Sequence, residues 1–261
     1  AWFFRPILQC FSLVGMQSEA DLQRIRAIGA ETRNSTVVGN LKYDIPFGPV
    51  PEEERQQLRQ RYRIPVDCTV LTAGSTHPGE EQQVLAAYRT LHQRFASLLL
   101  VLVPRHPERS GEIEQLAEQA GCRVVRRSRL EHHAGDCRAG TVLLVDTVGE
   151  LMGLYALSDL ALVGGSLVPT GGHNLLEPAS RGIPQLFGPH MDNFREIAAM
   201  VLDYGAGIQV ADQQELQTVI AECLTTPELR QVLGVNGLKL LRDSGGAAQR
   251  YLAALQALLP A

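Results

Sequence analysis

The sequence predicts an α/β fold, a Rossmann-like parallel sheet with helices on both of its faces. From residue 69 onward, short apolar runs alternate with stretches that have the periodicity of helices. The runs are apolar at consecutive positions, as expected for strands that are buried on both sides. The composition, 261 residues of which 45% are hydrophobic and 20% charged, is typical of an ordered globular chain.

The expected elements follow one another in a regular series. Strands are predicted at residues 69–73, 97–103, 122–126, 142–146, 160–163, 183–187 and 207–210, and helices at residues 79–95, 111–120, 149–157, from residue 174, and at 194–203. The stretch 213–259 is predicted to be helical, with breaks at Pro227 and at Gly245 and Gly246. Before the series, a strand at 11–16, a helix at 19–28 and an extended piece at 37–39 are expected. Three prolines within residues 44–51 predict a stiff linker and a domain boundary.

Charge and cysteine usage exclude several classes of function. The net charge is −4 and no segment is strongly basic, so nucleic acid is not an expected partner. The five cysteines form no CxxC pair and are expected to be reduced thiols. His132, His133, Asp136 and Cys137 lack the spacing of a metal site, and a surface loop is the preferred interpretation.

A glycine-rich turn follows the apolar run 160–163 and is the strongest single signal. It begins with Gly164 and Gly165 and leads to Asn174, which is expected to cap a helix, with Glu177 reaching back to the cap's amide. Such a turn lets a ligand approach the main chain, and free amides at a helix start favour an anion. A phosphate site for a nucleotide or a sugar nucleotide is therefore predicted, although a purely structural turn explains the pattern equally well.

Two more turns carry polar residues that a packing role does not fully explain. After residues 69–73, a capped helix start accounts for Glu80 and Glu81 but leaves Ser75, Thr76 and His77 without a role. Because ligands of parallel sheets bind beyond the carboxyl ends of the strands, these three are candidate ligand contacts.

After residues 97–103, Arg105 is expected to bind a phosphate, whereas Arg109 is expected to face water. A third turn, after residues 142–146, has Thr147 and Glu150 at the spacing of a capping box. That spacing alone favours a structural helix start, with amides that face the same cleft.

Taken together, the turns resemble those of the bacterial 3-deoxy-D-manno-octulosonic acid (Kdo) transferases. The resemblance rests on residues 74–81, 103–109, 146–151, 164–177 and 188–194, and on shorter matches at 17–19 and 39–44. These motifs occur in one consistent order over nearly the whole chain.

The resemblance implies a two-domain GT-B glycosyltransferase that moves Kdo from CMP-Kdo to a lipid A precursor at the cytoplasmic face of the bacterial inner membrane. It implies that residues 1–43 are the end of the N-terminal acceptor domain, 44–51 the linker, 52–242 the donor-binding domain and 243–261 a C-terminal helix. The family's membrane anchor and its catalytic glutamate base belong to the N-terminal domain, so they are expected outside this chain. The chain alone is then expected to be soluble and inactive.

The resemblance also assigns the donor contacts. CMP is expected to meet Pro104, Arg105, Val148, Gly149, Glu150, Asn174, Leu175, Leu176 and Glu177, and further donor contacts are expected at Ser75, Thr76, His77, Gly171, Gly172 and His173. No metal and no cofactor are implied. Two alternatives stay open: a GT-B enzyme or epimerase that uses UDP sugars, and a non-catalytic nucleotide-binding module.

Overall fold

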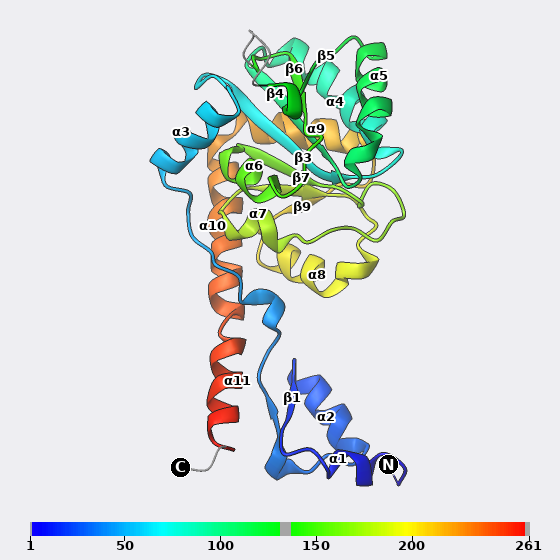
Figure 1. The fold of residues 1–261 in the computed structure, drawn as a ribbon, viewed down its shortest axis with the longest axis vertical. Helices are drawn as coiled ribbons and strands as arrows, with labels where there is room; N and C mark the ends of the chain where they lie inside the picture. Colours follow the sequence, from blue (N-terminus) through cyan, green and yellow to red (C-terminus); the bar gives the residue numbers. More distant parts are fainter. Residues whose placement is uncertain (1, 131–136, 259–261) are drawn as a thin grey trace. The chain divides into compact units, whose positions relative to one another are not determined.

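The computed structural model describes residues 2–130 and 137–258 (Figure 1). The chain divides into two compact units, Phe47–Leu240 and a smaller one made of Ala1–Pro46 with Leu241–Ala261. The chain therefore passes between the units twice.

The larger unit contains a seven-stranded sheet in the order β5-β6-β4-β3-β7-β8-β9, and every pairing in it is parallel. Its strands are β3 Thr69–Thr76, β4 Leu98–Pro104, β5 Arg123–Arg126, β6 Thr141–Leu144, β7 Leu160–Val163, β8 Gln185–Phe187 and β9 Ile208–Gln209. All seven expected strands are present, so the predicted Rossmann-like sheet is confirmed.

Helices cover both faces of this sheet, and alternate residues of one strand reach different cores. On β4, Leu98, Leu100 and Leu102 join a cluster with α4 (Glu80–Arg94), α5 (Ser110–Gln119) and α9 (Gln213–Thr225). Leu99, Val101 and Val103 point to the other face, toward α3 (Glu52–Arg61) and α6 (Leu151–Leu157). This two-residue alternation explains why the strands are apolar at every position.

The remaining helices of the larger unit are α7 (Leu176–Ser180), α8 (Arg195–Asp203) and the start of α10 (Pro227–Ser244). The breaks around α10 fall where the sequence predicts them, and α11 (Ala247–Gln256) follows the two glycines. Helix α3 was not expected, because its one buried residue, Arg59, gives it no apolar stripe. Of the loop after β5, His132, His133 and Asp136 lie outside the described residues, and Cys137 is buried.

The smaller unit pairs β1 (Val14–Met16) in parallel with β2 (Ser35–Val37), and α2 (Glu19–Ala27) joins them. Ser18 caps α2 by accepting a hydrogen bond from the amide of Asp21. Helix α11 belongs to the same unit: the guanidinium Nε of Arg250 donates to the carbonyl of Val38 at 2.9 Å, and the Asp44 carboxylate accepts hydrogen bonds from the amides of Gly246 and Ala248. A short helix, α1 (Arg5–Leu8), precedes β1.

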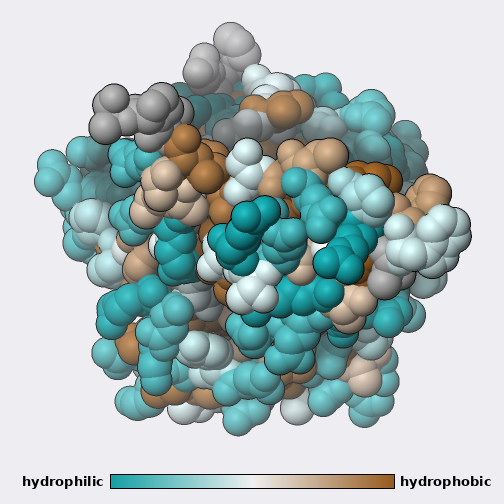
Figure 2. Space-filling model, turned by 90° about the horizontal axis from the view of Figure 1, so that it is seen from below, coloured by the Kyte–Doolittle hydropathy of each residue, from teal (hydrophilic) through white to brown (hydrophobic). Residues whose placement is uncertain are grey.

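Hydrophilic side chains predominate on the face drawn in Figure 2, where hydrophobic ones form small separate groups. Such a mixture is the usual surface of a folded globular chain. None of the helices in the described residues is both long enough and apolar enough to cross a membrane.

Candidate functional site

The sheet brings the polar turns together at its carboxyl edge. From the central strand β3 the chain goes to the neighbouring β4, then to the edge strand β5 and back to β6 between them, and it then builds β7, β8 and β9 on the other side of β3. The connection that leaves β3 leads to one side of the sheet and the connection that leaves β7 leads to the other side. The topological switch point of the sheet therefore lies between the adjacent strands β3 and β7. In open parallel sheets this is where ligands bind.

Three of the turns line one cavity of about 120 Å³ beside this point. Its walls are Ser75, Val103, Pro104, Arg105, Pro107, Thr147, Val148, Gly149, Glu150 and Leu151. Six predicted donor contacts, from the turns after β3, β4 and β6, therefore share one space.

Ser75 gives the turn after β3 its shape. Its φ of +57° lies in the left-handed region, at a bulge in the pairing of β3 with β4 between Gly74 and Thr76. A left-handed serine costs conformational energy, and such residues are concentrated at functional sites. The bulge also lets the carbonyl of Thr76 accept a hydrogen bond of 2.9 Å from the amide of Arg105, which fixes one turn to the next.

Arg105 and Glu177 are the two charged side chains of the site without a partner in the described part of the chain. Among the described residues, neither side chain takes part in a hydrogen bond or an ion pair, and Arg105 is exposed. Burial raises the pKa of Glu177, and the positive charge of Arg105 acts in the opposite direction. The two groups are thus within electrostatic reach of each other, and both are available to a ligand.

Glu150, in contrast, has its carboxylate fully engaged. The Tyr62 hydroxyl donates to it at 2.7 Å and the Arg127 guanidinium at 3.0 Å, while Thr147 donates its hydroxyl to the other oxygen. Burial alone would raise the pKa of Glu150, but these hydrogen bonds outweigh it and keep the pKa below its ordinary value. The main chain of this turn, including the exposed Gly149, is the part left for a ligand.

The capping box expected at this turn does not form. Helix α6 begins at Leu151, and no side chain caps its first amides. Thr147 instead donates its hydroxyl to the Glu150 carboxylate, which also accepts hydrogen bonds from Tyr62 and Arg127.

At the start of α7 the N-cap position of the described helix is Leu175, without a side-chain cap, and Asn174 lies one residue earlier. The side-chain oxygen of Asn174 accepts a hydrogen bond of 3.1 Å from the amide of Leu176. The return bond from Glu177 to the amide of Asn174 is absent from the described hydrogen bonds, so the reciprocal motif was wrongly expected. Leu175 and Leu176 have buried side chains, which leaves their backbone groups as the possible contacts.

The anion expected at the glycine turn is supplied by the protein itself. The buried carboxylate of Glu80 accepts hydrogen bonds from the amides of Gly165 at 2.6 Å, Ser166 at 2.9 Å and Leu167 at 2.8 Å. The same carboxylate accepts a fourth bond from the amide of His77. The amides of Gly165, Ser166 and Leu167 are therefore occupied by Glu80, whereas the amides predicted to favour an anion are those at the start of α7.

Two further charged residues are paired rather than solvated. Arg109, expected to face water, donates a hydrogen bond of 2.9 Å to the buried carboxylate of Glu81. Thr76 donates its hydroxyl to the same carboxylate at 3.1 Å, so its side chain is occupied. Sequence spacing could not reveal this pairing, because 28 residues separate Glu81 from Arg109.

Gly171 and Gly172 are required by packing. Both have positive φ, and a Cβ there would lie 2.3 Å from the Asn193 side chain and 2.4 Å from the Met191 sulfur respectively. The two glycines hold the loop after β7 against the loop after β8 and deliver His173 to the switch point.

His173 meets His77 across the switch point. Their Nε2 atoms lie 2.9 Å apart, and His106 packs edge-on against His77. Burial is the main cause that lowers the pKa values of His77 and His173. The neighbouring His77 and Arg105 lower the pKa of His173 further, to about 4. The sequence singled out both histidines, but their direct contact could not be anticipated from it.

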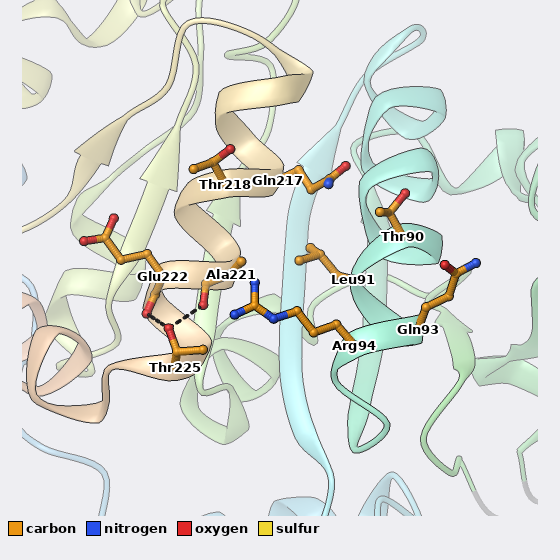
Figure 3. A pocket seen from close by; sticks show the side chains of 9 residues that line it. All are labelled: Thr90, Leu91, Gln93, Arg94, Gln217, Thr218, Ala221, Glu222 and Thr225. Atoms are coloured by element: carbon orange, nitrogen blue, oxygen red, sulfur yellow. Dashed lines mark hydrogen bonds between the residues drawn. The ribbon is translucent and has the colours of Figure 1, made fainter.

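A larger cavity of about 580 Å³ lies between α4 and α9 (Figure 3). Its lining includes Thr90, Arg94, Gln217 and Glu222, and the Arg94 side chain reaches across from α4 toward α9. Thr90 and Arg94 belong to the end of α4 that leads into β4, at the amino edge of the sheet and away from the turns that line the smaller cavity.

Known proteins are similar to this chain in both sequence and fold. A sequence model described as 3-deoxy-D-manno-octulosonic-acid transferase (kdotransferase) matches residues 1–45. A 3-deoxy-D-manno-octulosonic acid transferase of Haemophilus influenzae is 35% identical over 242 residues, which are 92% of this chain and 56% of the relative. One from Aquifex aeolicus is 33% identical over 82% of this chain and 54% of its own length. The chain thus spans about half the length of the curated relatives it matches.

Among solved structures, the C-terminal CMP-Kdo binding domain of WaaA from Acinetobacter baumannii is 35% identical, with a TM-score of 0.66. The match covers 72% of this chain and 96% of that domain. WaaG, a glycosyltransferase involved in lipopolysaccharide biosynthesis, is 19% identical with a TM-score of 0.56, which shows a common fold. On this evidence the chain belongs to the family of the 3-deoxy-D-manno-octulosonic acid transferases.

Proposed function

We propose that this chain is the donor-binding part of a glycosyltransferase that moves Kdo from CMP-Kdo to a lipid A precursor. The observation that carries the proposal is the shared cavity, whose lining includes Ser75 and five of the expected CMP contacts, Pro104, Arg105, Val148, Gly149 and Glu150. The 35% identity with a domain named for CMP-Kdo binding supports the choice of donor.

Arg105 binds the donor phosphate in this proposal. Its guanidinium has no partner among the described residues, stays charged at any working pH, and can contact two phosphate oxygens at once. As the bond between sugar and phosphate breaks, negative charge builds on the phosphate, and Arg105 stabilises it.

The other proposed donor contacts are of two kinds, one side chain and several backbone groups. Glu177 accepts hydrogen bonds from the ribose hydroxyls with its unpaired carboxylate. The backbone groups of residues 148–150 and 174–176 hold the rest of the nucleotide, because the Glu150 side chain is engaged and the two leucines are buried.

The acceptor and the site of action are further parts of the proposal. Because the family's general base and membrane anchor belong to its N-terminal domain, we assign the base's role to no residue of this chain. We expect the chain alone to transfer no sugar. The whole protein would act on a lipid A precursor at the cytoplasmic face of the inner membrane.

Calorimetric titration with CMP tests the donor site. We expect Arg105→Ala and Glu177→Ala each to weaken CMP binding by about 10-fold or more, since each removes a charged hydrogen-bonding group. Arg94→Ala, an exposed arginine at the other edge of the sheet, is the matched control and should bind as the unmodified chain does. Unchanged affinity in both site variants would contradict the proposal.

Competition separates the alternative functions. If UDP displaces CMP at equal concentration, a UDP-sugar enzyme or epimerase becomes the better assignment. If the whole protein binds CMP but transfers no Kdo to a lipid A precursor, a non-catalytic nucleotide-binding module is favoured.

A further inference from the structure

We propose that the His77–His173 pair is a proton-linked anion subsite of the donor pocket. In this role the pair takes up one proton from the buffer when an anionic group of the donor, its phosphate or the carboxylate of its sugar acid, binds beside Arg105. The inference rests on the proposed function and adds a second positive charge to its donor site.

The geometry joins two separate turns at one point. His77 follows β3 and His173 precedes α7, and the ring nitrogens that face each other are 2.9 Å apart. At this distance one Nε2 carries a hydrogen and the other accepts it, so the neutral pair holds one proton between the rings. The two rings are nearly parallel, with an interplanar angle of 18°.

Charge balance explains why the pair is needed. A nucleotide linked through a phosphodiester to a sugar acid carries two negative charges, whereas the residues described at the site include one arginine without a partner, Arg105. Arg109 is bound to Glu81, and Arg127 is bound to Glu150. The amides of the glycine turn, which could have balanced the second charge, are occupied by Glu80. An uncompensated charge in a partly buried site is costly, so a second cation is favoured there.

The surroundings of the pair keep it neutral until the donor binds. Glu80 and Glu81 act on His77 from α4, and Arg105 and His106 act on both histidines from the turn after β4. Both carboxylates are already engaged, Glu80 by four amides and Glu81 by Arg109 and Thr76. Burial and the positive charge of Arg105 then hold the pKa of each histidine below its usual value, so the free pair is uncharged at pH 7.

A bound anion reverses this balance. It attracts the protonated form, so the pKa of the pair is higher in the complex than in the free chain, and binding takes up a proton. Because the complex binds the extra proton, affinity for the donor increases as pH falls. In the complex we expect a pKa near the usual value for histidine, about 6.5, which gives an increase in affinity of about 3- to 4-fold between pH 7.5 and pH 6.0.

Calorimetry in two buffers tests the subsite. Titrations at pH 6.5 in PIPES and in Bis-Tris, which differ in ionisation enthalpy, give the number of protons taken up per ligand. The probes are CMP-Kdo and cytidine 5′-methylphosphate, whose phosphodiesters do not titrate in this range. We expect about half a proton or more for CMP-Kdo. An equal value for cytidine 5′-methylphosphate would place the phosphate at the pair, and a value near zero would place the sugar carboxylate there.

Variants identify the group that takes up the proton. His77→Gln and His173→Gln should abolish the uptake and weaken binding of CMP-Kdo by about 5- to 30-fold, while His92→Gln, at the far end of α4, should behave as the unmodified chain. Imidazole NMR titration of the unmodified chain, with and without ligand, should show a histidine pKa that rises on binding even if a variant folds poorly.

Binding without proton uptake, or uptake that survives in both variants, would overturn the inference and leave the proposed function intact. If neither probe binds to the unmodified chain, the proposed function itself fails, and this inference fails with it.

Discussion

The carboxylate of Glu80 lies 2.6 Å from the amide nitrogen of Gly165, 85 residues away along the chain. This contact fixes the glycine turn after β7 to the start of α4. The turn has the sequence of a phosphate-binding loop, yet its amides are satisfied from within the fold. The glycines therefore serve the packing of two neighbouring turns, and the donor must find its charge partners elsewhere.

We predict that Glu80→Gln destabilises the larger unit by about 3 kcal/mol. Each oxygen of Glu80 accepts two backbone hydrogen bonds, so the amide group of glutamine faces two N–H donors in either orientation. Urea unfolding measures the change. Glu108→Gln, an exposed acid after β4, is the control and should alter stability little. Equal stability of the two variants would show that the four bonds contribute nothing net.

Tyr62 is predicted to position the nucleotide-binding turn without touching the nucleotide. Its buried hydroxyl donates to Glu150, and its ring lies beneath the Arg127 guanidinium at 5.2 Å. Tyr62→Phe should weaken CMP binding by about 3- to 10-fold, because the turn at residues 147–150 loses one of its anchors.

Tyr88→Phe is the matched control for that variant. The Tyr88 hydroxyl is also buried, but it donates to the carbonyl of Thr141 at the opposite edge of the sheet. Both variants should lose about 0.5–1.5 kcal/mol of stability, and CMP affinity should fall in Tyr62→Phe alone. If both variants bind CMP equally well, Tyr62 has a structural role only.

Asp44 is predicted to make the stability of the smaller unit depend on pH. Hydrogen bonds, first from the amide of Ala248 and also from that of Gly246, lower the pKa of Asp44 although partial burial opposes them. A depressed carboxyl pKa stabilises the folded state above the unfolded value of 3.8, and this stabilisation is lost as pH falls through the lower folded value.

Asp44→Asn should therefore increase amide exchange in α11 at pH 6 and change it little at pH 2.5. Hydrogen exchange followed by mass spectrometry measures this, with Asp67→Asn, an exposed acid of the larger unit, as the control. A difference that persists unchanged at pH 2.5 would show that the charge of Asp44 is not involved.

Local pattern was sufficient to predict the sheet. The strands are apolar on both sides, and a run such as residues 98–104 is stable in few environments other than a strand that is buried on both faces of a sheet. Helix α3 was missed because it buries an arginine instead of an apolar stripe. Arg59 donates to the carbonyls of Pro65 and Cys68, a role that periodicity does not encode.

The sequence predicted which turns meet at the candidate site, but it did not predict which of their residues bond to one another. Topology alone required that the turns with Ser75, Arg105 and Glu150 meet at one edge, and they share a cavity. Which residues at that edge form hydrogen bonds with one another depends on tertiary geometry. Thr147 and Asn174 both had cap spacing, but neither occupies the cap position of a described helix: Asn174 bonds to the first amide of α7, and Thr147 bonds to the Glu150 side chain.

The composition of the smaller unit has a consequence for biosynthesis. Its strands β1 and β2 precede the whole of the larger unit in the sequence, whereas Gly246, Ala248 and Arg250, which complete their environment, follow it. The ribosome therefore makes every residue of the larger unit between the two parts of the smaller one, so the larger unit can fold first. Strands β1 and β2 then wait for α11, and the closure of this unit brings together residues more than 200 positions apart.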